Sequence, residues 1–292
     1  MRVTQSMIYN STNASLSADL AALQSITEKV SSTKQLNRPS DNPADVRSAV
    51  GLRDTLSQIN QFLRNIDSAS SKVSAQDTAL ASAGDLIQRA NELAIEGANG
   101  TLDASQRQAI GAEVSQLTEA MAQDASAKVG DEYIFSGFRV DRAPYQVTGP
   151  GQVSAYQGDH GVVIARVGAG STMQINMSGD AVFQPALNAL TQLQADLNSG
   201  QPVQQSTIGQ IQTALSALTQ ARATVGARAN RLAGAKTSQQ ALQTSNQSLL
   251  SQLEDTDMPS AITELTKRQT TYQATLAVTA KVMQTNLLDY LR

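Results

Sequence analysis

The feature that most constrains the fold is an apolar seam that runs through residues 44–96 with few breaks. Leu, Ile and Val recur three or four residues apart, at Leu52, Leu56, Ile59, Leu63, Ile66, Val73, Leu80 and Ile87. This spacing is the near-heptad repeat of an amphipathic helix. One helix over 44–96 would be roughly 80 Å long at 1.5 Å per residue. Because the polar or small residues Ser70, Asp77 and Gly84 share the seam, a helix bundle is favoured over an isolated coil.

Further seams of the same period predict three more helices in the middle of the chain. One begins at Asp103 or Ser105 and ends near Lys128, and a short one begins at Pro185. A second long one covers residues 208–253. Aromatic residues make up only 3% of the chain and Trp is absent, whereas a compact enzyme of this length usually buries more large rings. The composition therefore suits long helices that pack through small and aliphatic side chains.

Residues 133–184 have a different character. The runs YIFSGF, APYQV, QVSAYQ, GVVIARV and MQINM are short, prone to form strands, and separated by Gly, Pro and Asp. We expect a small β-rich insertion between the helices.

Two apolar stripes at the chain ends predict terminal helices. The first stripe, in a helix over about 13–33 that follows a loose segment 1–12, is Leu16, Leu20, Leu23 and Val30. The second is Leu265, Tyr272, Leu276, Met283, Leu287, Leu288 and Leu291. Ordering such helices costs more backbone entropy than their own apolar burial returns. We therefore expect the terminal helices to pair with each other and with neighbouring subunits, and to become ordered on assembly.

A Pro-bearing break separates the first terminal helix from the first long one. Pro39 disfavours helical backbone at the residue before it, and the next proline suits the first position of a helix. An Asn cap and an Asp in the first turn complete a helix start. A calcium loop is disfavoured because the distal Glu is missing. The break and cap motif consists of Arg38, Pro39, Asp41, Asn42, Pro43 and Asp45.

The predicted fold is mainly α with a small β-rich insertion. It is a long-helix bundle or coiled coil in which the N- and C-terminal helices are paired. Three regions follow from this nesting. Residues 1–39 with 256–292 form a terminal assembly region, 40–132 with 185–255 form a central long-helix domain, and 133–184 form a small outer domain.

Composition and motifs disfavour several classes of protein. A net charge of −3 without a basic block gives little support for nucleic-acid binding. The absence of Cys excludes disulfides and thiolate metal sites, and the single histidine, His160, lies in the turn-like GDHG. The glycine cluster at 168–171 lacks the strand–helix context of a dinucleotide site. We therefore predict no catalytic, cofactor or metal site. No run approaches the roughly 20 apolar residues of a membrane span, and the first residues lack a secretory signal.

Three motifs carry a resemblance to a known family. RPSDNPADV at 38–46, GDEYIFSGF at 130–138 and NLLDYLR at 286–292, in this nested layout, resemble the hook-associated protein 3 family of flagellin-like proteins. The resemblance implies a structural adaptor at the bacterial hook–filament junction that joins hook-associated protein 1 to the first flagellin subunits. It implies copies arranged in a ring-like layer outside the cell. It also implies flagellar type III export without a cleaved signal, and an export chaperone that binds residues 260–292.

Two alternatives stay open. The chain could be flagellin itself, which would form long filaments alone. It could also be the coiled-coil stalk of a sensor or adhesin, which would be a stable rod with protease-resistant ends.

Overall fold

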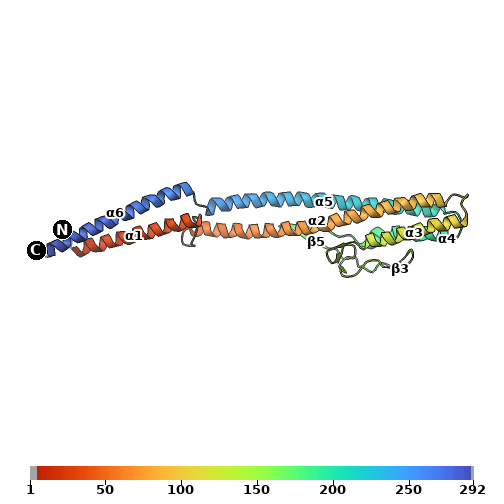
Figure 1. Cartoon of the computed structure of the whole chain (residues 1–292), viewed down its shortest axis with the longest axis horizontal. Coiled ribbons are helices and arrows are strands. Elements are labelled where there is room, and N and C mark those ends of the chain that lie inside the picture. The colour runs from red at the N-terminus through yellow and green to blue at the C-terminus, as the bar shows by residue number, and fades with distance from the viewer. Residues whose placement is uncertain (1–4, 291–292) are drawn as a thin grey trace. The chain divides into compact units, whose positions relative to one another are not determined.

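The fold is mainly helical, as predicted. The computed structural model describes residues 5–290, without the side chains of residues 5, 6, 8 and 282–290. Its helices are α1 (Gln5–Ser32), α2 (Pro43–Gly97), α3 (Ala104–Ala125), α4 (Gly179–Asn198), α5 (Gln205–Glu254) and α6 (Met258–Tyr290) (Figure 1). The chain forms two compact units. Unit 1 contains residues 1–58 and 243–292, and unit 2 contains residues 59–242. The long helices α2 and α5 belong partly to each unit.

In unit 1, α1 and α6 lie side by side and run in opposite directions (Figure 1). The predicted pairing of the terminal helices is therefore confirmed. The expectation of a loose segment over residues 1–12 is wrong for its described part, because α1 already begins at Gln5. Ser11 and Thr12 line a groove together with residues of α6, so α6 accompanies this first part of α1.

The helix starts follow local capping chemistry. The seam over 44–96 becomes α2, which begins and ends one residue outside the predicted range. Asp103 caps α3: its carboxylate accepts the Gln106 N–H at 2.8 Å, and the Gln106 side chain accepts the Asp103 N–H at 2.9 Å. The prediction that α3 ends near Lys128 is wrong, because Lys128 already pairs with Tyr133 in a hairpin.

The insertion between α3 and α4 contains three separate antiparallel hairpins. They are β1 (Lys128–Val129) with β2 (Glu132–Tyr133), β3 (Val147–Gly149) with β4 (Gln152–Val153), and β5 (Ile164–Gly168) with β6 (Ser171–Gln174). The strand expectation was too broad for YIFSGF, since only Tyr133 of that run belongs to a strand. Ile134 and Phe135 are instead buried in a loop. Their apolar character reflects core packing and not strand formation.

Helix α4 begins earlier than predicted. It starts at Gly179, and Pro185 lies inside the helix. Val182 and Phe183, which precede the proline, are buried in the core. Tertiary packing therefore extends the helix upstream of the residue that a sequence pattern would take as its start.

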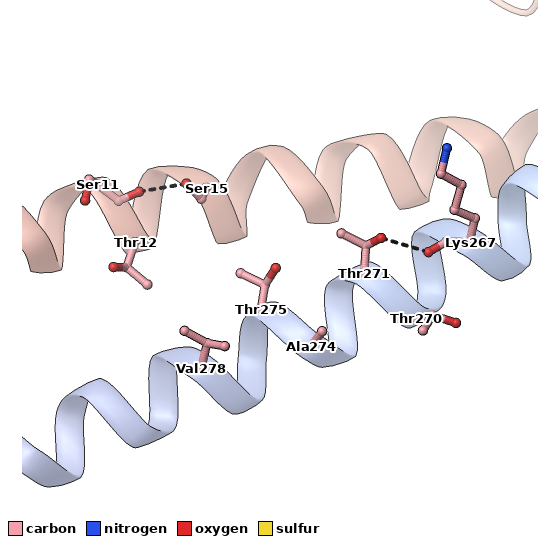
Figure 2. A pocket seen from close by; sticks show the side chains of 9 residues that line it. All are labelled: Ser11, Thr12, Ser15, Lys267, Thr270, Thr271, Ala274, Thr275 and Val278. Carbon is pink, nitrogen blue, oxygen red and sulfur yellow. Dashed lines mark hydrogen bonds between the residues drawn. The ribbon is translucent and has the colours of Figure 1, made fainter.

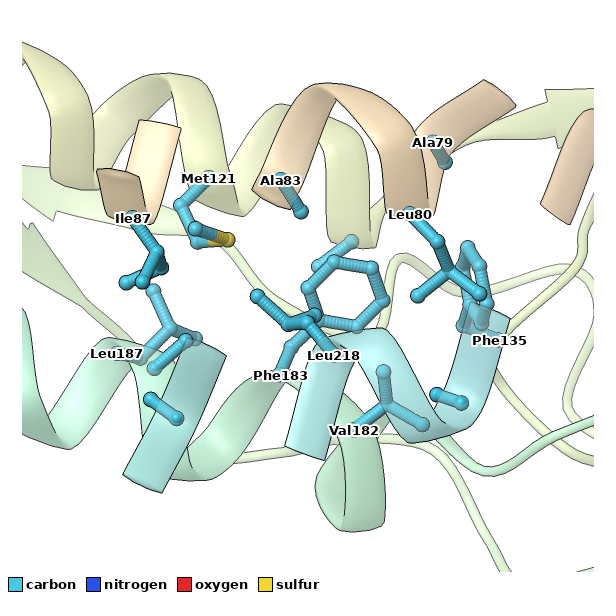
Figure 3. Close-up of a cluster of buried hydrophobic side chains, with 14 of the residues drawn as sticks. Ala79, Leu80, Ala83, Ile87, Met121, Phe135, Val182, Phe183, Leu187 and Leu218 are labelled. Carbon is cyan, nitrogen blue, oxygen red and sulfur yellow. The ribbon is translucent and has the colours of Figure 1, made fainter. Parts of the chain in front are cut away.

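The core of unit 2 joins four helices and the insertion (Figure 3). Phe135 of the insertion meets Phe183 of α4 edge to face, with 4.9 Å between the ring centroids. Ala79 and Ala83 of α2 are buried in the same cluster. The side chains labelled in Figure 3 are Ala79, Leu80, Ala83 and Ile87 of α2; Met121 of α3; Phe135 of the insertion; Val182, Phe183 and Leu187 of α4; and Leu218 of α5.

The long helices also hold the β5–β6 hairpin through its backbone carbonyls. The Asn65 side-chain amide of α2 donates to the Arg166 carbonyl at 3.1 Å. Gln239 of α5 donates to the Val167 carbonyl at 3.2 Å. The unpaired N–H and C=O groups of a strand edge are a template for pairing with another chain. The two amides satisfy part of this hydrogen-bonding capacity in β5.

Candidate functional site

The predicted assembly stripes lie on the paired terminal helices, but they are not buried there. Leu16, Leu23 and Val30 of α1 are half-buried, as are Leu265 and Tyr272 of α6. Leu20 and Leu276 are each 40% exposed. The side chains of Met283, Leu287 and Leu288, and the whole of Leu291, lie outside the described residues. Among the described side chains of α1 and α6, only Ala261 is buried.

A groove of about 710 Å³ runs between the two terminal helices (Figure 2). Thr275 of α6 donates a hydrogen bond to the Asp19 carboxylate of α1 at 2.8 Å. Ser15 and Thr271, which line the groove, donate to backbone carbonyls of their own helices. Because these hydroxyls are satisfied locally, the groove does not offer the converging polar groups of a small-molecule site. Its lining is Ser11, Thr12, Ser15, Lys267, Thr270, Thr271, Ala274, Thr275 and Val278.

Several large apolar side chains of the two terminal helices are strongly exposed, and Val278 among them lines the groove. Met7 and Tyr9 of α1 are 61% and 53% exposed, and Ile262 and Val278 of α6 are 50% and 59% exposed. The predicted stripes missed Met7, Tyr9 and Val278. Tyr9 could have been found, because it lies seven residues before Leu16 and continues the heptad spacing.

The break and cap motif is a compact structural turn. The Asn42 side-chain oxygen accepts the backbone N–H groups of Ala44 at 3.1 Å and Asp45 at 3.3 Å, and Pro43 is the first residue of α2. Asp41 accepts the N–H groups of Arg38 at 2.8 Å and Asn37 at 3.0 Å. These two backbone bonds, that of Arg38 foremost, lower the pKa of Asp41. The Arg38 guanidinium binds Glu28 of α1 at 2.7 Å.

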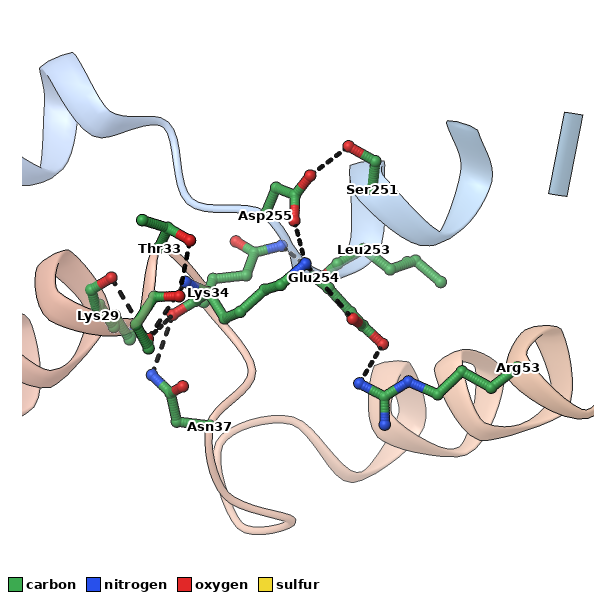
Figure 4. A network of polar contacts seen from close by, with 11 residues as sticks. Lys29, Thr33, Lys34, Asn37, Arg53, Ser251, Leu253, Glu254 and Asp255 are labelled. Carbon is green, nitrogen blue, oxygen red and sulfur yellow. Dashed lines mark hydrogen bonds and ion pairs between the residues drawn. The ribbon is translucent and has the colours of Figure 1, made fainter. Parts of the chain in front are cut away.

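The chain is interrupted between α1 and α2 and again between α5 and α6. These two breaks meet at a structure that we call the joint, made of residues 33–35, residues 251–256 and Arg53 (Figure 4). The Gln35 N–H donates to the Glu254 carbonyl at 2.7 Å, and the Thr256 N–H donates to the Thr33 carbonyl at 2.9 Å. The Gln35 side chain also donates to the Leu253 carbonyl at 2.7 Å. Thr33 has a φ of 58°, a left-handed conformation that is unfavourable for a β-branched residue. The breaks are therefore held in one defined geometry.

Charged groups surround these backbone bonds. The Lys34 ammonium lies 2.5 Å from an Asp255 oxygen and 3.7 Å from a Glu254 oxygen. Glu254 is buried, and Arg53 of α2 binds its carboxylate at 2.7 Å. The hydrogen bond from Lys34 lowers the pKa of Asp255, and the same bond raises the pKa of Lys34. Sequence reasoning assigned no role to these four residues. Asp255 begins the DTDMPS stretch at 255–260, which marks a break between helices, but nothing in the sequence indicates that it pairs with Lys34.

The single histidine has polar neighbours but no catalytic geometry. His160 Nδ1 lies 3.3 Å from Ser178 Oγ and 3.4 Å from Asp180 Oδ1. In a Ser–His–Asp relay the two partners use opposite nitrogens of the ring, and here both face the same one. Among the described residues, no cluster of His, Asp or Glu is suited to hold a metal ion. Within the same part of the chain, no helix combines the length and apolarity needed to cross a membrane.

Comparison with known families places the chain. Residues 3–139 match the family profile of the bacterial flagellin N-terminal helical region, and residues 207–291 match that of the bacterial flagellin C-terminal helical region. The two matches together cover about three quarters of the sequence. The chain belongs to the flagellin family. The matched segments contain α1, α2, α3, α6 and all but the first two residues of α5, whereas α4 and the β3–β6 hairpins lie between them.

Relatives within the flagellin family bear the names of structural flagellar proteins. Flagellar hook-associated protein 3 of Salmonella typhimurium is 26% identical over 220 residues, which cover 75% of this chain and 67% of that protein. Flagellin of Bacillus subtilis is 25% identical over an alignment that covers 100% of both chains. The crystal structure of flagellar hook-associated protein 3 from Legionella pneumophila has the same fold. Its TM-score is 0.63 at 15% identity, and the match covers 69% of this chain and 98% of that one.

Proposed function

We propose that this protein is a structural adaptor at the hook–filament junction of the bacterial flagellum. It joins hook-associated protein 1 to the first flagellin subunits and carries out no reaction. The observation that carries this proposal is the sequence similarity to flagellar hook-associated protein 3 over 220 residues. The likeness in fold to the Legionella protein supports it.

The terminal region, residues 1–39 with 256–292, is the proposed assembly interface. Support comes from the exposure of Leu20 and Leu276, which leaves an apolar face available to other subunits. Copies of the chain form a ring-like layer through this face. The region 40–132 with 185–255 is the proposed central domain, and 133–184 is the outer domain. Export proceeds through the flagellar type III apparatus without a cleaved signal, with a chaperone bound to residues 260–292.

Deletion of the gene in its own bacterium tests the junction role. We expect hooks to remain, filaments to be lost and flagellin to appear in the medium. The wild-type gene should restore filaments, and Leu276→Asp should not. Gln273→Asp, at an exposed position of the same helix, is the matched control and should restore them. Filaments that persist after deletion would refute the proposal.

Flagellin is the second candidate, because the Bacillus subtilis protein matches this chain from end to end. Flagellin would form long filaments on its own under salting-out conditions. The adaptor should stay soluble or form small oligomers. Analytical ultracentrifugation and negative-stain microscopy of the purified chain separate the two candidates. Limited proteolysis addresses the stalk alternative, which predicts ends that resist cleavage.

A further inference from the structure

The contact between α1 and α6 is poorly suited to hold one fixed register. No described side chain of α1 is buried, and the buried side chain of α6, Ala261, is small and close to the start of that helix. Farther along, Leu20 and Leu276 keep 40% of their surface exposed. A helix pair that buries so little apolar surface gains little free energy from any one alignment. Another part of unit 1 must therefore determine how α6 lies against α1.

The joint has the properties that the helix faces lack. It connects the residues that follow α1 with the end of α5 and the residues before α6, through backbone bonds of 2.7 and 2.9 Å. A two-residue bridge of this kind is marginal in water without further support. The joint lies directly after the end of α1 and just before the start of α6. A change in its backbone geometry therefore changes the direction of a whole terminal helix.

Ion pairs supply the further support. Two carboxylates, Glu254 and Asp255, face two cations, Lys34 and Arg53. The Glu254 side chain keeps only 6% of its surface exposed, so losing a cation would leave a desolvated charge poorly compensated. Arg53 belongs to α2 and Lys34 follows α1, so Glu254 ties both to the end of α5.

We propose that the joint is an electrostatic latch that determines the register of α6 on α1. When its ion pairs are broken, α6 separates from α1 while residues 59–242 stay folded. The latch is a property of the isolated chain and does not depend on the proposed role at the hook–filament junction.

Spin labels can test the latch directly because the chain has no native cysteine. Ser15→Cys and Ala274→Cys place one label on each helix, at positions that line the same groove. Pulsed electron–electron double resonance on the labelled full chain should give one narrow distance distribution. Lys34→Met and Asp255→Asn should each broaden or shift it. Arg38→Met is the control. It removes the ion pair between Arg38 and Glu28, which has a comparable length and lies outside the joint, and it should leave the distance distribution unchanged.

Hydrogen exchange provides the second readout on the same full-length variants. Lys34→Met should speed exchange in residues 261–281 by up to about fivefold, and leave residues 79–94 unchanged. Lys34→Asp combined with Asp255→Lys restores an opposite-charge pair and should recover part of the narrow distribution. The proposal is overturned if Lys34→Met behaves like Arg38→Met. It is also overturned if Lys34→Met speeds exchange in residues 79–94 as much as in 261–281.

Discussion

Units 1 and 2 share long helices with the same apolar period, yet they bury very different amounts of that pattern. In unit 2, large side chains such as Ile66, Leu80 and Phe183 are fully buried, and the helices share them with the insertion. In the described part of unit 1, the buried apolar residues are Ala49 and Ala261. A heptad seam therefore predicts a helix with an apolar face in both units, but it does not tell what covers that face.

The two units also differ in the interactions that hold them. Unit 2 has a large buried apolar core, and ion pairs such as Arg89–Glu113 lie outside that core on partly exposed side chains. Unit 1 depends on backbone bonds and ion pairs at the joint, together with helix contacts that leave apolar residues exposed. Regions with few buried apolar contacts open at a lower free energy than the core. We expect unit 1 to open first in the isolated chain.

The largest expected difference between the units comes from removing an aromatic core side chain. Phe183→Ala deletes a fully buried ring that packs against Phe135, and should lower the free energy of unfolding by about 3–5 kcal/mol. Leu276→Ala is the matched truncation in unit 1 and should cost less than about 1 kcal/mol, because the side chain is 40% exposed. Urea unfolding followed by circular dichroism measures both. Equal losses would mean that the terminal helices form an ordinary core.

A second difference separates a crowded turn from an open one within unit 2. Gly137 has a φ of +73°, and a Cβ there would meet the Asp159 backbone oxygen at 2.3 Å. Gly137→Ala should therefore cost about 2–4 kcal/mol. Gly170→Ala, with a φ of +74° and open space around it, should show only the backbone penalty of about 1 kcal/mol. A Gly170 variant as unstable as the Gly137 variant would contradict this difference between the two turns.

The third prediction concerns the helix start that the sequence motif specifies. Asn42→Ala removes the acceptor for the Ala44 and Asp45 N–H groups and should cost about 1 kcal/mol. Ser40→Ala, at an exposed position of the same turn, should have no measurable effect. Hydrogen exchange at residues 44–47 reports the change locally. No difference between the two variants would show that the cap does not stabilise α2.

The smallest expected effect is the pH dependence of the joint. The pKa of Asp255 is lower in the folded chain than in the unfolded one. Its ion pair therefore contributes stability above the unfolded pKa of about 3.9, and this stability is lost as pH falls through the folded pKa. The pKa of Lys34 is higher in the folded chain than in the unfolded one. The stability that its ion pair contributes is therefore present below the unfolded pKa of about 10.4 and is lost as pH rises through the folded pKa. The Ser15–Ala274 label distance should be constant between about pH 5 and 9. In the Asp255→Asn variant, the label distance should no longer show the change at acid pH that protonation of Asp255 causes.

The sequence predicted what local chemistry determines. The seam over 44–96 and the caps at Asn42 and Asp103 specify α2 and α3 through period and hydrogen bonding. The joint could not be predicted, because Lys34 and Asp255 are 221 positions apart and lie in breaks without a pattern. Phe135 and Pro185 show the opposite case, in which a local signal is present but does not determine the structure. The run around Phe135 resembles a strand and the proline resembles a helix start, but core packing overrides both local signals.

We expect that, in the isolated chain, the terminal helices of unit 1 pair but open readily, whereas unit 2 stays closed. Hydrogen exchange with mass spectrometry on dilute, monomeric full-length protein tests it most directly. We predict that residues 9–30 and 261–281 exchange much faster than residues 79–94 and 182–197, and become protected when the chain assembles with flagellar partners. Equal protection of both units in the monomer would contradict this account.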